Sequence, residues 1–170
     1  LSHHNFTAGL TETQIGCLQT LAREVSFAEN ELVLMTGQHS KYFYLLLTGS
    51  VCIEARTRAY TISVQSLGPG EAFGWSSLLD NHDTLFQVRA REQSTALCLE
   101  GEALGAAFRA DPELAVEILR RALKVVAGRV LATETMLGQL CGMRFPPAPA
   151  RLRTSATRHR IGARPPRRAS

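Results

Sequence analysis

Apolar residues in the first hundred positions fall into short runs that turns interrupt. These turns include Thr36-Gly37, Thr48-Gly49 and Gly68-Pro69-Gly70. Runs of roughly four to eight β-rich residues bounded by such turns are typical of strands. The sequence therefore predicts a mainly β protein with helices (α+β), built on an antiparallel, jelly-roll-like β-roll over residues 25–100. The expected strands are residues 32–35, 42–47, 51–55, 60–67, 85–90 and 95–99.

Helical periodicity is found before and after the expected roll. Thr11 and Gln14 have the spacing of a capping box, and the apolar residues that follow recur at three-residue intervals, which predicts a short N-terminal helix. A second short helix is expected over residues 102–110. Asp111 can then cap, and Pro112 can begin, a long helix that is expected to run to about residue 143.

The expected long helix carries two apolar stripes. One stripe contains Leu114, Ile118, Ala122 and Val125 and can cover the roll, whereas the other has the alternating four- and three-residue spacing of a coiled-coil seam. Because two stripes require two partners, the sequence predicts a homodimer that forms through the long helix. The seam residues are Leu119, Leu123, Val126, Val130, Thr133, Leu137 and Leu140.

Residues 67–79 join two glycine turns to a run that can begin a helix. They read Leu-Gly-Pro-Gly-Glu-Ala-Phe-Gly-Trp-Ser-Ser-Leu-Leu. Gly70 and Gly74 permit backbone angles that other residues rarely adopt, and the amides that follow Gly74 would present the positive end of a short helix. This stretch predicts an anion site, with a phosphate group as the candidate ligand.

The order and spacing of these turns resemble the cyclic nucleotide-binding domain family over residues 6–140. The matching segments are Phe27-Ala-Glu-Asn-Glu-Leu, Phe43-Tyr-Leu-Leu-Leu-Thr-Gly-Ser-Val and Gly70-Glu-Ala-Phe-Gly. The resemblance implies a cassette in which a Glu after Phe-Gly binds the ribose hydroxyl and a later Arg binds the cyclic phosphate. In this chain Trp75 and Thr84 occupy those two positions.

The expected long helix is similar to that of the catabolite activator protein branch of the family. The resemblance implies that this helix pairs two subunits and closes over the base of the nucleotide. It places Thr133 where a threonine meets the adenine edge, and Glu134 where a serine reaches across from the other subunit. Read from the residues alone, Thr133 is a polar residue in a seam, and both interpretations remain open.

These observations predict a non-enzymatic regulatory sensor domain that binds a cyclic nucleotide or another small anionic ligand in a divergent cassette and requires no cofactor. Two alternatives remain open: a Crp/Fnr-type transcription regulator, truncated or assisted by its tail on DNA, and a dimerisation module with a vestigial pocket. Arg89 and Arg91 share one face of an expected strand, which is interpreted as a solvated face outside the site. The candidate ligand-binding residues are Gly74, Trp75, Ser76, Ser77, Thr84, Leu85 and Thr133.

Composition narrows the class of protein. The chain has 170 residues, 45% of them hydrophobic, which suits one buried core. It has no apolar run of bilayer length and no signal-peptide pattern, so a cytoplasmic protein without a membrane span is expected. Its four cysteines and five histidines lack metal-site spacing, so no metal site is predicted. The pair His3-His4 is interpreted as part of a solvated terminus.

The composition changes after Met143. Residues 144–170 contain eight arginines and no acidic residue, so they carry a charge of +8, and residues 1–143 carry −4. The change in composition predicts two parts of the chain: a cyclic nucleotide-binding-like domain of residues 1–143 and a disordered Arg/Pro-rich tail of residues 144–170. The tail keeps nucleic acid as a candidate partner, although its 27 residues leave no room for a helix-turn-helix.

Overall fold

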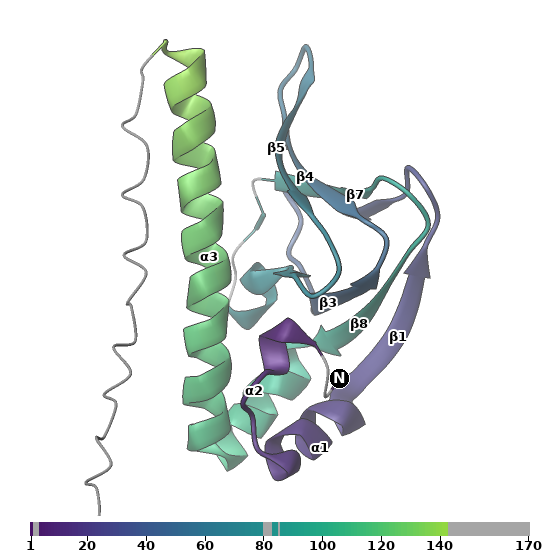
Figure 1. The fold of residues 1–170 in the computed structure, drawn as a ribbon, viewed down its shortest axis with the longest axis vertical. Helices are drawn as coiled ribbons and strands as arrows, with labels where there is room; N and C mark the ends of the chain where they lie inside the picture. The colour runs from purple at the N-terminus through teal and green to yellow at the C-terminus, as the bar shows by residue number, and fades with distance from the viewer. Residues whose placement is uncertain (2–3, 80–82, 85, 143–170) are drawn as a thin grey trace, which may run out of the picture.

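The computed structural model describes residues 1, 4–79, 83–84 and 86–142, and its strands form two antiparallel four-stranded sheets (Figure 1). The order in one sheet is β1-β8-β3-β6, and the order in the other is β2-β7-β4-β5. The predicted β-roll with helices is therefore confirmed. The strands are β1 (Ala22–Phe27), β2 (Leu32–Leu34), β3 (Tyr42–Thr48), β4 (Val51–Arg56), β5 (Thr61–Leu67), β6 (Ala72–Phe73), β7 (Phe86–Ala90) and β8 (Ser94–Glu100).

Three α-helices and two short 3₁₀ helices accompany the sheets. The expected capping box is present at the start of α1, where Thr11 and Gln14 each accept a hydrogen bond from the other's backbone amide. The side chain of Asp111 caps α3 by accepting from the Leu114 amide at 3.0 Å. The helices are η1 (Asn5–Thr7), α1 (Glu12–Leu21), η2 (Trp75–Leu78), α2 (Gly101–Ala110) and α3 (Pro112–Leu140).

The boundaries of several elements differ from those expected. The roll begins at Ala22 in β1 rather than at residue 25, because Ala22 already pairs with Leu99 of β8. The last helix ends at Leu140 rather than near residue 143, and Gly142 follows it with a φ of 66°. Such a positive φ is the left-handed conformation in which helices commonly end.

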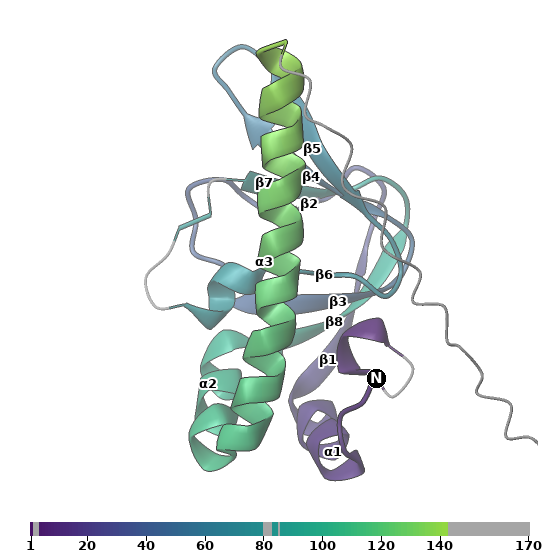
Figure 2. The same ribbon diagram turned by 60° about the vertical axis from the view of Figure 1, so that its left-hand side comes forward.

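Two apolar clusters hold these layers together. The first fills the space between the sheets and contains Leu46, Val51 and Phe73. The second lies between the outer face of the β3-containing sheet and the helices, where Leu114 and Ile118 of α3 are 0% and 1% exposed. Figure 2 shows α3 standing across this side of the roll. The stripe that was expected to cover the roll therefore does so.

Arg89 of β7 and Arg91, which follows the strand, have side chains that are 31% and 43% exposed, but they do not lie on a purely solvated face as expected. Both guanidinium groups pair with the carboxylate of Glu54, at 3.4 and 2.8 Å, and Glu54 is only 3% exposed. The Gln87 side chain donates a further hydrogen bond of 2.6 Å to the same carboxylate. Cross-strand pairing of β4 with β7 brings these residues together, a proximity that spacing within one strand cannot reveal.

The N-terminal segment is also more buried than expected. His4 is 7% exposed, accepts a hydrogen bond from the Phe6 amide and lies 3.1 Å from the carbonyl oxygen of Leu46. Burial lowers the pKa of its imidazole. His4 is therefore packed against the roll rather than solvated as the sequence indicated, and its neighbour His3 lies outside the described residues.

Two other predictions meet the limits of the described residues. The Arg/Pro-rich tail of residues 144–170 lies outside them. Among the helices that are described, none combines the length and the apolar character needed to cross a bilayer.

Candidate functional site

A cavity of about 360 Å³ opens between the roll and α3, a size within the range of small-molecule sites. Its walls are mainly apolar and come from strands of both sheets, with Leu34, Ile53, Phe73, Phe86 and Val88 among the lining residues. Because the cassette predicted from sequence forms one side of it, we call this space the roll cavity.

The cassette adopts the glycine-dependent conformation that the sequence indicated. Gly74 has a φ of 78°, and a Cβ at this position would lie 2.5 Å from the Tyr42 carbonyl oxygen. A side chain is therefore excluded both by the backbone angle and by the neighbouring strand. Trp75 and Ser76 follow immediately in η2, and all three residues line the roll cavity.

Trp75 contributes to two parts of the structure. It lines the roll cavity as predicted, and it also packs against the apolar cluster beneath the helices. Ser77 lies elsewhere, because its hydroxyl and its amide both donate to the Gly74 carbonyl oxygen, at 2.8 and 3.0 Å. Ser77 is therefore not among the residues lining the roll cavity.

Thr84 lines the roll cavity, but its hydroxyl is held by local hydrogen bonds. The hydroxyl donates to the Phe86 carbonyl oxygen at 2.7 Å and accepts from the Phe86 amide at 3.2 Å. The neighbouring Asp83 adds an exposed carboxylate to the lining, which sequence reasoning did not single out. Leu85 falls outside the described residues.

Thr133, the site candidate on α3, is half-buried and is absent from the roll-cavity lining. Its hydroxyl donates to the carbonyl oxygen of Arg129, one turn earlier, at 2.9 Å. The structure thus brings together Gly74, Trp75, Ser76 and Thr84 at the cavity and places Ser77 and Thr133 away from it.

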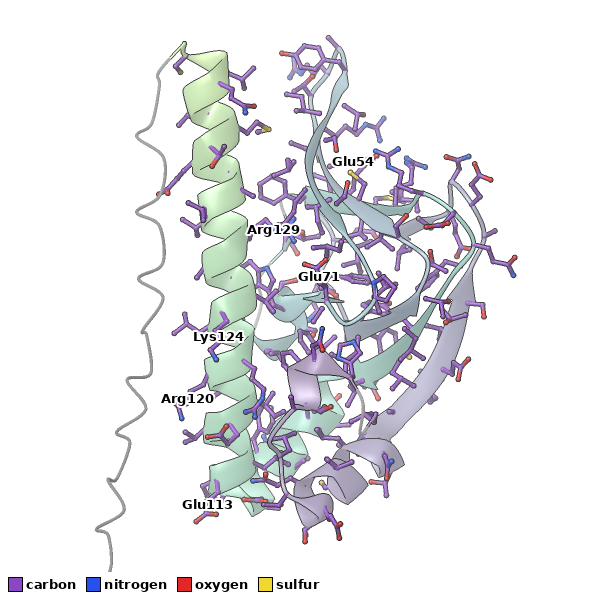
Figure 3. The ribbon with its side chains drawn as sticks, viewed as in Figure 1. Glu54, Glu71, Glu113, Arg120, Lys124 and Arg129 are labelled. Carbon is purple, nitrogen blue, oxygen red and sulfur yellow. The ribbon has the colours of Figure 1, made fainter. Side chains whose placement is uncertain are left out.

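Arg129 is the cavity residue that sequence reasoning missed. It is 7% exposed, and it is the one Lys or Arg among the described residues that line the roll cavity. Its Nη1 atom is buried without a hydrogen-bond partner in the described part of the chain. Burial lowers the pKa of the guanidinium to about 10, so the group remains a cation at neutral pH. Figure 3 shows Arg129 on the side of α3 that faces the roll, toward Glu71.

A signal for Arg129 existed in the sequence. The inward stripe Leu114, Ile118, Ala122 and Val125 advances by three or four residues, and the next step of four reaches Arg129. A charged residue on a buried helical stripe is unusual, because desolvation of an unpaired charge is costly. The same stripe that predicted packing could therefore have predicted a buried cation.

Comparison with known proteins adds two kinds of finding. Residues 24–111, about half of the chain, match the sequence model of a family described as the cyclic nucleotide-binding domain. Among curated proteins, none matches the chain significantly in sequence.

Solved structures show the same fold at low sequence identity. The catabolite activator protein of Thermus thermophilus is 22% identical with a TM-score of 0.66, and the alignment covers 81% of this chain and 63% of that protein. A c-di-GMP-responsive global regulator from Xanthomonas campestris is 20% identical with a TM-score of 0.70, over 79% of this chain and 66% of the regulator.

A third similar structure is the regulatory subunit of a cAMP-independent protein kinase A from Trypanosoma brucei. It is 21% identical with a TM-score of 0.61, over 73% of this chain and 44% of the subunit. A triple mutant of that subunit, one of whose substitutions is threonine to arginine, has been solved with cAMP bound in its A site.

Proposed function

Because the chain belongs to the cyclic nucleotide-binding domain family, we propose that it is a regulatory sensor that binds a small anionic ligand in the roll cavity and acts through binding rather than catalysis. Arg129 carries this proposal. A buried guanidinium with an unpartnered Nη1 is costly in the free protein and is compensated when an anion supplies the missing acceptor. A pocket that had lost all function would gain stability by losing such a group.

The proposed ligand differs in its contacts from an ordinary bound cyclic nucleotide. Trp75 and Thr84 stand where the family resemblance implies a carboxylate and an arginine. Loss of one partner from a buried charge pair costs about 2 to 5 kcal/mol, which corresponds to roughly 30- to several-thousand-fold in affinity. In our proposal the anionic group therefore turns toward Arg129, and a hydroxyl or amino donor faces the Asp83 carboxylate.

We also propose that the sensor is a homodimer paired through α3. Five leucine and valine residues of the expected seam are between 45% and 67% exposed in the single chain, which leaves an apolar face of the helix without a partner. They are Leu119, Leu123, Val130, Leu137 and Leu140. The alternative of a tail-assisted DNA-binding regulator depends on residues outside the described part of the chain.

A titration of the full chain with a panel of cyclic mono- and dinucleotides tests the ligand proposal. Trp75 is the only tryptophan and lines the roll cavity, so its fluorescence reports on that cavity directly. Calorimetry in parallel gives the affinity. We expect one member of the panel to bind with a change in Trp75 emission, and Arg129→Gln to abolish the response; no response to any member argues for a vestigial pocket.

The unmodified protein is expected to bind cyclic AMP weakly or not at all. Trp75→Glu together with Thr84→Arg supplies a carboxylate for the ribose hydroxyl and a fork for the phosphate, and micromolar binding of cyclic AMP should then appear. The cAMP complex of the Trypanosoma brucei triple mutant, one of whose changes is threonine to arginine, supports the arginine half of this design. Calorimetry measures the gain after circular dichroism has shown that the variant is folded. Tight binding of cyclic AMP by the unmodified protein would refute our assignment of these two positions.

A further inference from the structure

A second and larger cavity, of about 530 Å³, lies on the other side of Arg129. It is bounded by the N-terminal segment around Phe6, by the turn from Leu67 to Ala72 and by α3. We call it the outer cleft. Figure 2 shows α3 and the N-terminal segment side by side over this part of the roll. Gly128 lines the cleft, and the space beside it is open, since a Cβ added there would meet no atom within 4 Å.

Two buried polar atoms without partners belong to residues that line the outer cleft. One is Nη1 of Arg129, a hydrogen-bond donor, and the other is Oε1 of Gln65 on β5, an acceptor. Buried polar atoms are hydrogen-bonded in the great majority of cases, and each exception needs an explanation. An unpaired donor and an unpaired acceptor on two residues that line the same cleft favour an occupant that has an anionic oxygen for the first and an O–H or N–H group for the second.

The charges around the cleft favour an anion. Four cationic side chains line it, against the carboxylates of Glu71 and Glu117. Glu117 is occupied, because it pairs with Arg120 at 3.2 Å and with Arg121. Glu71 accepts a hydrogen bond of 2.7 Å from the Gly68 amide. The lining therefore retains a net positive charge.

The cations differ in how free they are to bind. Arg121 is structural, because it also donates to the Ala8 carbonyl oxygen at 2.9 Å and so ties α3 to the N-terminal segment. Lys124 is exposed and forms no ion pair with a described residue. It lies one helical turn from Arg120, and Figure 3 shows both side chains projecting from α3. These two cations stand at the rim of the cleft, with Arg129 at its buried end.

We propose that the outer cleft is a second binding site, which shares Arg129 with the roll cavity, for a small phosphorylated compound that also carries a hydroxyl group. Because one Nη1 atom cannot face both ligands, Arg129 serves one of the two sites at a time. The phosphate lies between Arg129 and the rim cations, and the hydroxyl donates to Gln65. Charge-assisted bonds from guanidinium and ammonium groups are the strongest contacts available to such a ligand. Its size is limited to that of a sugar phosphate or a single nucleotide by the volume of the cleft.

Ribose 5-phosphate is a suitable probe, with ribose as its uncharged match. Calorimetry on the full chain at physiological salt should show saturable binding of the phosphate ester and none of ribose. Trp75 lines the roll cavity and not the cleft, so its emission should stay unchanged during this titration. If water alone satisfies the two atoms, no saturable signal will be found, and the proposal fails.

Variants locate the binding. Arg129→Gln should weaken it by about 30-fold or more, since it removes the desolvated charge. Lys124→Gln with Arg120→Gln should weaken it by about three- to tenfold. The matched control is Arg56→Gln with Arg58→Gln, which removes the same charge from exposed positions on and beside β4. Equal losses in the rim pair and in the control pair would show nonspecific attraction to a basic chain and would overturn the proposal.

Two further measurements keep the cleft and the roll cavity distinguishable. Gln65→Leu removes the unpaired acceptor from the cleft without touching the roll cavity, and should weaken ribose 5-phosphate by about two- to tenfold even if Arg129→Gln fails to fold. Thr84→Val alters only the roll cavity, so it should leave ribose 5-phosphate binding unchanged. A loss caused by Thr84→Val, or none caused by Gln65→Leu, would place the ligand elsewhere.

Discussion

The two long faces of α3 are both apolar but depend on different partners. On the face toward the roll, Leu114, Ile118 and Ala122 are no more than 6% exposed, whereas Leu123 and Leu137 on the opposite face are 67% and 53% exposed. The inner face packs against the roll of the same chain. At Arg129 a cation takes the place of the next apolar residue on this face. The outer face has no such partner among the described residues. One face of a helix can thus be packed within its own fold, while the other face remains available to a second molecule.

The largest expected effect is on assembly through the outer face. Leu123→Glu with Leu137→Glu places carboxylates in the seam and should convert the proposed dimer into monomers, because burial of each leucine contributes about 1.5 to 3 kcal/mol. Analytical ultracentrifugation measures the change. Leu131→Glu is the control, since this residue is 63% exposed and directly follows Val130, so it lies off the seam. An unmodified protein that is monomeric at tens of micromolar would refute the dimer.

The inner face should respond in stability rather than in assembly. Leu114→Ala creates a cavity beneath a fully buried side chain and should lower the free energy of unfolding by about 2 to 5 kcal/mol. The same truncation at Leu140 should cost a monomer little, because that side chain is 67% exposed. Urea unfolding, performed on the seam double mutant so that assembly does not contribute, separates the two. Equal decreases in the free energy of unfolding at the two positions would show that the two faces of α3 do not differ in packing.

Arg129 should behave in the opposite way from the leucines that precede it. Arg129→Met keeps the length of the side chain and removes a buried, unpaired charge, so the ligand-free protein should become more stable by about 1 to 3 kcal/mol. Binding at the roll cavity and the outer cleft should be lost in the same variant. Thermal unfolding with and without ligand measures both. A loss of stability would show that the guanidinium serves packing rather than binding.

The smallest expected effect concerns His4, which lies in the N-terminal segment on the side of α3 that faces the roll. Its pKa is lowered by burial, so the folded protein holds a neutral imidazole while the unfolded chain takes up a proton near pH 6.5. Stability should therefore be constant with respect to this group above about pH 6.5 and decrease as the pH falls below that value. Urea unfolding at pH 7.5 and 5.5 should show a smaller decrease for His4→Gln than for the unmodified chain. Identical decreases would show that His4 is not the group responsible.

Sequence patterns predicted the parts of this molecule that depend on local periodicity. The capping box at Thr11, the left-handed Gly74 and the stripe that begins at Leu114 follow from spacing, and the family resemblance is confirmed by the match over residues 24–111. The pairing of Glu54 with Arg89 and Arg91 could not be predicted, because it depends on which strands become neighbours.

The candidate site was predictable only in part, for the same reason. The cassette residues Gly74, Trp75 and Ser76 are consecutive, so one motif identifies them together. Arg129 and Gln65 reach the cavities from elements far apart in sequence. The helical stripe could have marked Arg129 as buried, but Gln65 is unremarkable within its own segment. Their significance lies in atoms left without partners, and hydrogen-bond satisfaction is a property of the folded chain.

The first residue of α2 restricts how the site can change during evolution. A Cβ on Gly101 would overlap the carbonyl oxygen of Ser77, at the cassette helix η2, and the Gly101 amide is held by the Lys41 carbonyl oxygen at 2.9 Å. Any substitution at Gly101 must displace η2 and with it Trp75 and Ser76. Gly101 lines neither of the two cavities proposed to bind ligands. Selection on the shape of the roll cavity should nevertheless act on this position, because a side chain here would displace η2. Drift in the shape of the roll cavity is consequently limited by a glycine that lies outside that cavity.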